Sequence, residues 1–304
     1  MKGALSTGVN ATLMYFSPVM RVLVVSLVLV FLAVDVVVSA ESKPSTAALL
    51  EEAKKAFRLG KRKEAIKIAN RMIEGDPENL SCYFLRARIF ELEGKREMAV
   101  ADYSKIVELA PFAPEARYHR GTQLFLLGRI PESVADFDML AEIQPDRAAH
   151  HWQRGIALYY AGRYEDGQKQ FELHQTVNAR DVENSTWHFI CVARQKGVEE
   201  ARKSLIPVVG DPRVPMTQVL EMYAGKMTPD EVLRAAEAPG SAKHLLSMQQ
   251  MYAHLYIALL YEAEGKQELV KKHLRKAVDL NLKGEYMWEV ARVHLELLDS
   301  GKLK

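Results

Sequence analysis

The sequence has little cysteine, glycine and proline, and no marked excess of either charge. Its 304 residues include 17 Gly and 12 Pro, too few for a low-complexity chain. The 41 basic and 39 acidic residues give a net charge of +2, which excludes the class of nucleic-acid-binding proteins that depend on a basic excess. With 48% hydrophobic residues, the chain can bury a sizeable core in one or two domains.

Motifs that carry catalytic or metal chemistry are also missing. No two of the nine histidines are three or four residues apart, so no helix presents a two-histidine metal face. The sequence contains no H-E-x-x-H, G-x-S-x-G, C-x-x-C or phosphate-loop motif. We therefore expect no catalytic residue, no metal, no cofactor and no enzymatic activity.

The first forty residues differ from the rest. Arg21 precedes an almost uninterrupted apolar run, Val22–Val34, and small residues follow at the end of this segment, up to Ala40. This pattern predicts a secretory signal peptide that is cleaved after Ala40. Because Val22 to Ala40 is nearly long enough to span a bilayer, although Asp35 interrupts it, an uncleaved membrane anchor stays open as the alternative.

The start of the chain is open as well. Met20 and Arg21 begin a compact signal, whereas the residues before them match neither a signal nor a repeat, so translation starts at Met1 or at Met20. No cysteine lies near the cleavage point, and the sequence therefore has no lipid-attachment signal of the bacterial lipoprotein kind.

From residue 47 onward the sequence repeats itself every 34 residues. Glycines recur at this spacing at positions 60, 94, 128 and 162, prolines at 77, 111 and 145, and small residues at 53, 87, 121 and 155. A period of 34 with this punctuation is the signature of tetratricopeptide repeats, each a pair of antiparallel helices. We predict an all-α tetratricopeptide-repeat solenoid with a C-terminal capping helix, because each helix pair must stack on the next to bury its apolar face.

The repeat divides the chain into parts and decides the state of its two cysteines. In order, the parts are a signal peptide or anchor (1–40), a short linker (41–46), four regular repeats (47–179), an irregular helical segment (180–240), and a repeat-like unit with the capping helix (241–304). Cys82 and Cys191 lie about three repeats apart, far beyond the ~7 Å between Cα atoms that a disulfide tolerates. We expect two buried free thiols.

The later part of the chain resembles one family of repeat proteins. The segments "RGIALYYAGR" (154–163) and "YAGKMTPDEVLRAA" (223–236), together with the layout after the regular repeats, are similar to the NlpI family of bacterial envelope adaptors. The resemblance covers residues 47 to 300 and implies an adaptor that holds envelope proteases or cell-wall hydrolases. One feature departs from the family: NlpI proteins are lipoproteins, and this sequence lacks the lipid-attachment cysteine.

The first helix of each repeat is expected to line a concave groove with its second, fifth, ninth and twelfth positions. These positions are rich in aromatic residues, and aromatic and Arg side chains in a concavity are typical anchors for a protein partner. The candidate binding residues are Phe84, Arg88, Tyr118, Phe125, Trp152 and Tyr159. Packing between neighbouring repeats is the alternative role for these rings.

Arg86, Arg120 and Arg154, at the seventh position, are expected to pair with carboxylates of adjacent helices.

A basic cluster marks the first repeat. It comprises Lys54, Lys55, Arg58, Lys61, Arg62, Lys63 and Lys67. One interpretation is a solvated helix face, since Glu51, Glu52 and Glu64 are interspersed. The other is contact with anionic lipid or with a polyanionic wall polymer.

Together these patterns predict an exported, non-enzymatic adaptor or scaffold that binds extended or helical segments of other proteins in its groove. A structural component of an envelope or secretion assembly is the alternative function. The expected location is the periplasm or cell envelope, with membrane anchoring if the N-terminal segment is not cleaved. We expect no nucleic-acid partner; membrane contact through the N-terminal segment and formation of a homodimer stay open.

Overall fold

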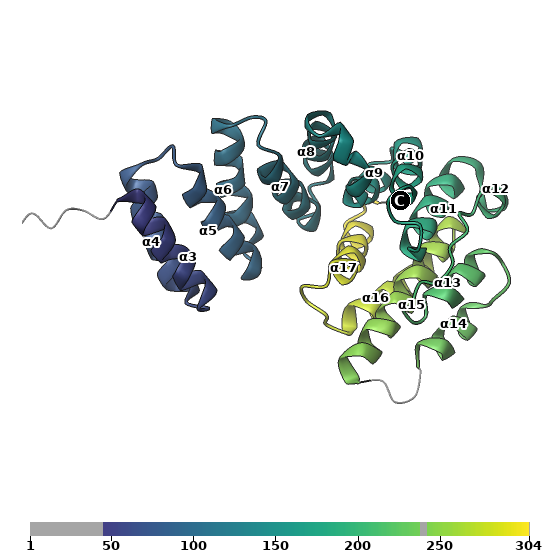
Figure 1. Cartoon of the computed structure of the whole chain (residues 1–304). Helices are drawn as coiled ribbons and strands as arrows, with labels where there is room; N and C mark the ends of the chain where they lie inside the picture. The colour runs from purple at the N-terminus through teal and green to yellow at the C-terminus, as the bar shows by residue number, and fades with distance from the viewer. Residues whose placement is uncertain (1–44, 238–241, 304) are drawn as a thin grey trace, which may run out of the picture. The chain divides into compact units, whose positions relative to one another are not determined.

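The computed structural model describes residues 45–237 and 242–303 (Figure 1). Every regular element in these ranges is a helix, and the described residues from Leu50 onward form one compact unit. The predicted signal peptide or anchor at residues 1–40, and the choice between Met1 and Met20, lie outside the described residues. None of the helices in the two ranges has both the length and the apolar character that crossing a bilayer would require.

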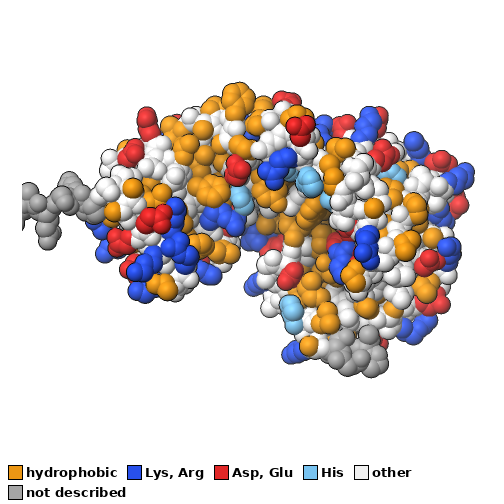
Figure 2. Space-filling view, in the orientation of Figure 1, with side chains coloured by type: hydrophobic (Ala, Val, Ile, Leu, Met, Phe, Trp, Pro, Cys, Tyr) orange, Lys and Arg blue, Asp and Glu red, His pale blue; other side chains and the backbone are white. Residues whose placement is uncertain are grey.

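Three regular helix pairs follow one another at the predicted 34-residue spacing. They are α3 (Thr46–Arg58) with α4 (Arg62–Gly75), α5 (Leu80–Leu92) with α6 (Arg96–Leu109), and α7 (Pro114–Leu126) with α8 (Ile130–Ile143) (Figure 1). Lys and Arg side chains gather over the first pair (Figure 2). The turn inside each pair holds a glycine with positive φ, 73° at Gly60 and 68° at Gly94 and Gly128, where a side chain would be strained. The predicted turns are confirmed.

The fourth repeat begins differently. The spacing predicts its first helix from residue 148, but residues Pro145–His150 form a 3-10 turn (η1), and helix α9 (Trp152–Tyr160) starts after it. Side chains of helix α10 (Tyr164–Gln175) hydrogen-bond the backbone of η1. Gln170 Nε2 donates to the Ala148 carbonyl, and His174 Nδ1 lies at hydrogen-bonding distance from the Ala149 carbonyl, both at 2.8 Å. These bonds satisfy carbonyl groups that a regular helix would have paired internally.

The small residues at the eighth position mark close contacts between helices, as predicted. A Cβ atom added to Gly155 would lie 2.6 Å from the Phe171 ring, and one added to Gly121 would lie 3.2 Å from the Cβ of Asp136. Phe171 cannot move aside cheaply, because it is 1% exposed and stacks on Trp187. Glycine is therefore required for the approach of α9 to α10.

The seventh-position arginines tie successive repeats together, which confirms the predicted pairing. Each guanidinium bridges the second helix of its own repeat, sixteen residues later, and that of the preceding repeat, sixteen residues earlier. The partners are Asp102 and Asn70 for Arg86, Asp136 and Ser104 for Arg120, and Gln170 and Asp138 for Arg154. In the first two cases the carboxylate lies in the arginine's own repeat. Arg154 instead pairs with Asp138 of α8, so this ion pair joins the third and fourth repeats. Such charge-assisted bonds fix the register of the stack.

The irregular segment and the repeat-like unit are also helical. The helices are α11 (Val182–Lys196), α12 (Val198–Lys203), α13 (Met216–Tyr223), α14 (Pro229–Ala236), α15 (Lys243–Ala263), α16 (Gln267–Asp279) and α17 (Tyr286–Asp299). Helix α14 begins with a capping box in which Thr228 and Glu231 exchange hydrogen bonds. Cys82 and Cys191 are free and buried, as expected, and burial raises the pKa of both thiols.

Helix α17 does more than cap its neighbours. It packs against α15 and α16 and also against α7 of the third repeat. Arg292 Nη2 donates to the Leu126 carbonyl (2.7 Å), and Arg96 pairs with Glu289, so two charged contacts hold α17 to the second and third repeats. Figure 1 shows α17 beside α9. The C-terminal helix thus lies against the repeats that precede it by more than a hundred residues.

Gly155→Ala tests this packing. The added methyl group would overlap the fixed Phe171 ring, and we expect it to lower the free energy of unfolding by about 1–3 kcal/mol. Gly75→Ala is the matched control, because a Cβ atom there meets nothing within 4 Å and the position is helical. Thermal unfolding should show a lower midpoint for the first variant and an unchanged or higher one for the second; equal midpoints would contradict the register.

Two histidines that are far apart in sequence meet between α15 and α16. Nδ1 of His254 lies 3.0 Å from Nδ1 of His273, so at least one ring must be neutral for a hydrogen bond to form. Burial is the main cause that lowers the pKa of each histidine from 6.5 to about 4. His273 and Lys276 lower the pKa of His254 further. Lys276 and Lys272 lower the pKa of His273 further, and Asp230 opposes this change.

This pair predicts a loss of stability in acid. Between pH 6.5 and about 4 the unfolded chain binds protons on these histidines that the folded chain does not, so the free energy of unfolding falls as the pH falls through this window. The thermal midpoint should drop from pH 7 to pH 5, and the drop should be smaller in His273→Gln. An identical pH dependence for the variant and the native chain would show that the pair does not titrate in this way.

Candidate protein-binding groove

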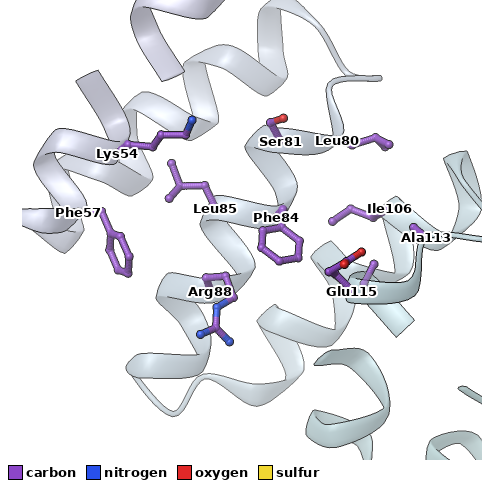
Figure 3. Close-up of a pocket in the computed structure, with 11 residues that line it drawn as sticks. Lys54, Phe57, Leu80, Ser81, Phe84, Leu85, Arg88, Ile106, Ala113 and Glu115 are labelled. Carbon is purple, nitrogen blue, oxygen red and sulfur yellow. The ribbon is translucent and has the colours of Figure 1, made fainter. Parts of the chain in front are cut away.

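An apolar pocket opens on the concave side of the first three repeats. It has a volume of about 540 Å³ and is built by α3, α5, α6 and α7 (Figure 3). Its apolar wall is made of Phe57, Leu80, Phe84, Leu85 and Ile106, and its charged rim of Lys54, Arg88 and Glu115. Five of these residues, Lys54, Phe57, Phe84, Arg88 and Glu115, occupy the second, fifth, ninth or twelfth position of their repeat, which are the predicted groove positions.

Phe84 and Arg88 are the two predicted binding residues that line this pocket. The Phe84 ring is half-buried and packs edge-on against Tyr103 and His119, with centroids 5.8 and 5.7 Å apart. Arg88 pairs with Glu91 through Nη1, which also lies 3.0 Å from Nδ1 of His119, yet 39% of the Arg88 side chain stays exposed. The pocket therefore offers one fixed ring and one oriented cation to a ligand.

Tyr118 and Trp152, at the fifth positions of the next two repeats, are tied to their surroundings. The Tyr118 hydroxyl accepts a hydrogen bond of 2.6 Å from Gln153 Nε2, and its ring packs against Phe137. The Trp152 ring meets Tyr286 of α17 edge-on, with centroids 5.0 Å apart. Both side chains are half-buried, and neither lines the apolar pocket.

Phe125 and Tyr159 are interior residues. Phe125 is fully buried between Tyr160 and Tyr286, and Tyr159 is 2% exposed, with its hydroxyl donating to Glu262 Oε2 at 2.6 Å. The predicted binding role of Phe125 and Tyr159 must therefore be corrected, because both side chains are buried. Helices α15 and α17 cover the concave side of the fourth repeat, and the rings there serve packing instead of forming a free surface.

A buried polar network holds this covered part together. Besides the bond from Tyr159 to Glu262, the Tyr160 hydroxyl lies 3.0 Å from Nδ1 of His294, and Nε2 of His294 lies 3.6 Å from Glu262 Oε1. Burial raises the pKa of both tyrosines well above 10 and lowers the pKa of His294, although Glu262 opposes the latter change. These groups join α9, α15 and α17.

Sequence reasoning missed three residues of the apolar wall. Leu80, Leu85 and Ile106 do not occupy groove positions, and Ile106 comes from the second helix of its repeat. Phe57 is an aromatic residue at the twelfth position of the first repeat, so the sequence pattern could have identified it as a groove residue. In the described ranges, no group of three or more His, Cys, Asp or Glu side chains could hold a metal ion.

Comparison with known proteins identifies the fold. No protein-family model matches the chain, and no curated protein matches it in sequence. A tetratricopeptide repeat protein from Parabacteroides merdae is similar in structure, with a TM-score of 0.56, 16% identity, and coverage of 82% of this chain and 98% of that chain. The fold is thus that of a tetratricopeptide-repeat solenoid, as the 34-residue period predicted.

Two further solved structures also match. PilF of Pseudomonas aeruginosa matches with a TM-score of 0.44 and 12% identity, covering 82% of this chain and 97% of that chain. YrrB, described as a TPR protein with an unusual peptide-binding site, matches with a TM-score of 0.41 and 15% identity, covering 74% of this chain and 97% of that chain. At these identities the similarity concerns the fold.

Tyr159→Phe tests the buried network. The change leaves the Glu262 carboxylate without its hydroxyl donor in the interior, which should lower the free energy of unfolding by about 1.5–3 kcal/mol. Tyr261→Phe is the matched control, because the Tyr261 hydroxyl makes no hydrogen bond with the described residues. Denaturant unfolding should separate the two variants clearly; equal stabilities would mean that the Tyr159–Glu262 bond contributes little.

Proposed function

We propose that this protein is a non-enzymatic adaptor that binds a segment of a partner protein in the apolar pocket of its first three repeats. The observation that carries the proposal is the pocket itself: an exposed apolar concavity with Phe84 at its wall and cations on its rim, on the face that repeat solenoids use for binding. The partner segment would place an apolar side chain against Phe84 and a carboxylate near Lys54 or Arg88.

The resemblance to NlpI adaptors supports a finer form of this proposal. In that form the protein is exported, acts in the cell envelope, and holds proteases or cell-wall hydrolases. The similar layout of residues 154–163 and 223–236 supports this assignment, whereas the missing lipid-attachment cysteine means that another device must keep the protein at the membrane if it stays there. A structural part of an envelope assembly would use the same pocket but would co-purify with a large membrane complex.

Two double variants test the proposal. Phe84→Ala with Arg88→Ala removes the wall and rim of the pocket and should weaken partner binding by at least about 2 kcal/mol at a temperature where the variant is fully folded. Tyr118→Ala with Trp152→Ala alters packed rings and should chiefly lower the thermal midpoint. The partner is first captured from a cell-envelope extract with the native chain, and affinities are then measured by titration with the purified partner.

The native affinity in the pocket variant, at a temperature where it is fully folded, would refute the assigned site. A loss of affinity only in the second variant would place the partner on the part of the repeats that α17 covers.

A further inference from the structure

A basic patch covers the outer surface of the first repeat. It consists of exposed residues on α3, α4 and the turn between them: Lys55, Arg58, Lys61, Arg62, Lys63, Lys67 and Arg71. Figure 2 shows the Lys and Arg side chains gathered there. Residues 51–71 hold eight Lys and Arg against three Glu, whereas the whole chain has a net charge of only +2. Positive charge is therefore concentrated on α3, the first part of α4 and the turn between them.

Few ion pairs compensate the cations of the patch, although Glu51, Glu52 and Glu64 lie among them in sequence. Lys63, Lys67 and Arg71 follow each other at a spacing of four on α4, which places three like charges in one column on the helix, where they repel. None of these three side chains forms a hydrogen bond or an ion pair with the described residues. In this patch only Lys61 has a carboxylate partner, Glu64 at 3.4 Å. These three unpaired cations do not stabilise the fold, because they repel one another.

The other repeats show that the fold does not require cations there. The positions equivalent to Lys63, Lys67 and Arg71 hold Glu97, Ala101 and Lys105 in the second repeat, Pro131, Ala135 and Met139 in the third, and Glu165, Lys169 and Leu173 in the fourth. The two cations among these nine residues are paired, Lys105 with Glu108 at 2.8 Å and Lys169 with Glu165 at 2.7 Å. The uncompensated column belongs to the first repeat alone.

An exposed apolar side chain lies within the patch. Leu59 is 63% exposed in the turn between α3 and α4, directly after Arg58 and two residues before Lys61. An apolar tip surrounded by cations suits an anionic membrane, since the tip can enter the headgroup boundary while the cations stay with the lipid phosphates. A nucleic acid or an acidic protein would use the cations but would leave Leu59 in water.

We propose that the basic patch docks the first repeat on an anionic membrane surface, with Leu59 entering the interface. In sequence the patch follows the apolar run at residues 22–34, so that two membrane-directed features lie in the first quarter of the chain. The contact uses lipid headgroups as its ligand and leaves the apolar pocket for the protein partner. The two sites are therefore separable by mutation.

Vesicle binding by the full chain tests the proposal. Sedimentation is compared between vesicles of phosphatidylcholine alone and vesicles that contain 30% phosphatidylglycerol, and the ratio of the two partition coefficients cancels any contribution of residues 22–34. Each cation contributes about fivefold at an anionic surface, so Lys63→Gln with Lys67→Gln and Arg71→Gln should lower this ratio by roughly 100-fold. Leu59→Ser should lower binding to the anionic vesicles further, and 0.5 M salt should abolish the difference between the two vesicles.

A matched control changes three exposed lysines outside the patch, Lys169→Gln with Lys203→Gln and Lys226→Gln, and should leave the ratio within about twofold. The melting temperature of the patch variant should stay the same or rise, because like-charge repulsion is relieved, so a loss of vesicle binding cannot be ascribed to unfolding. An equal ratio for the patch variant and the control overturns the proposal. So does a patch variant that loses binding to heparin but keeps its full ratio on vesicles, which would assign the patch to a soluble polyanion.

Discussion

The buried contact between the C-terminal helix α17 and the middle repeats determines which surface of this solenoid is free. Its centre is a set of polar groups with almost no access to water: Tyr159 bonded to Glu262, and Tyr160 bonded to His294. Separating these helices would break both buried hydrogen bonds at a large cost, so the network favours the joint docking of α9, α15 and α17. The aromatic rings around the network add apolar burial to the same junction.

This constraint divides the concave side into two parts with different roles. The fourth repeat and the adjoining part of the third are closed by the chain's own C-terminal helices. The first three repeats keep an apolar pocket in which Phe84 and Arg88 face outward from a rigid helix pair. Arg86 and Arg120, each bonded to two successive repeats, hold the helices that build this pocket in register. The outer surface of the first repeat adds a basic patch, so that one end of the stack offers two separate contact surfaces.

Local features could be predicted from the sequence, but long-range docking could not. The period of 34 located the turn glycines, the helix pairs, the close contact at Gly155 and the structural arginines, because each of these depends on neighbours within one or two repeats. The contact of Trp152 with Tyr286 joins residues more than 130 positions apart, and no periodic signal marks it. Trp152 and Tyr159 therefore looked the same in sequence as Phe84, although Trp152 and Tyr159 contact α17 and α15 while Phe84 lines an open pocket. The delayed start of α9 was hidden for a similar reason, since it depends on side-chain bonds from α10.

Thiol labelling measures this division of the concave side most directly. Phe84→Cys and Tyr159→Cys each place one thiol on a predicted groove position, and the native Cys82 and Cys191 are buried. We expect the thiol at position 84, at the wall of the open pocket, to react readily with a small maleimide. The thiol at position 159 should react at least about a hundredfold more slowly, because it must wait for local opening of the helices that cover it. Equal and fast labelling at both positions would contradict the account, since it would mean that α15 and α17 do not cover the fourth repeat.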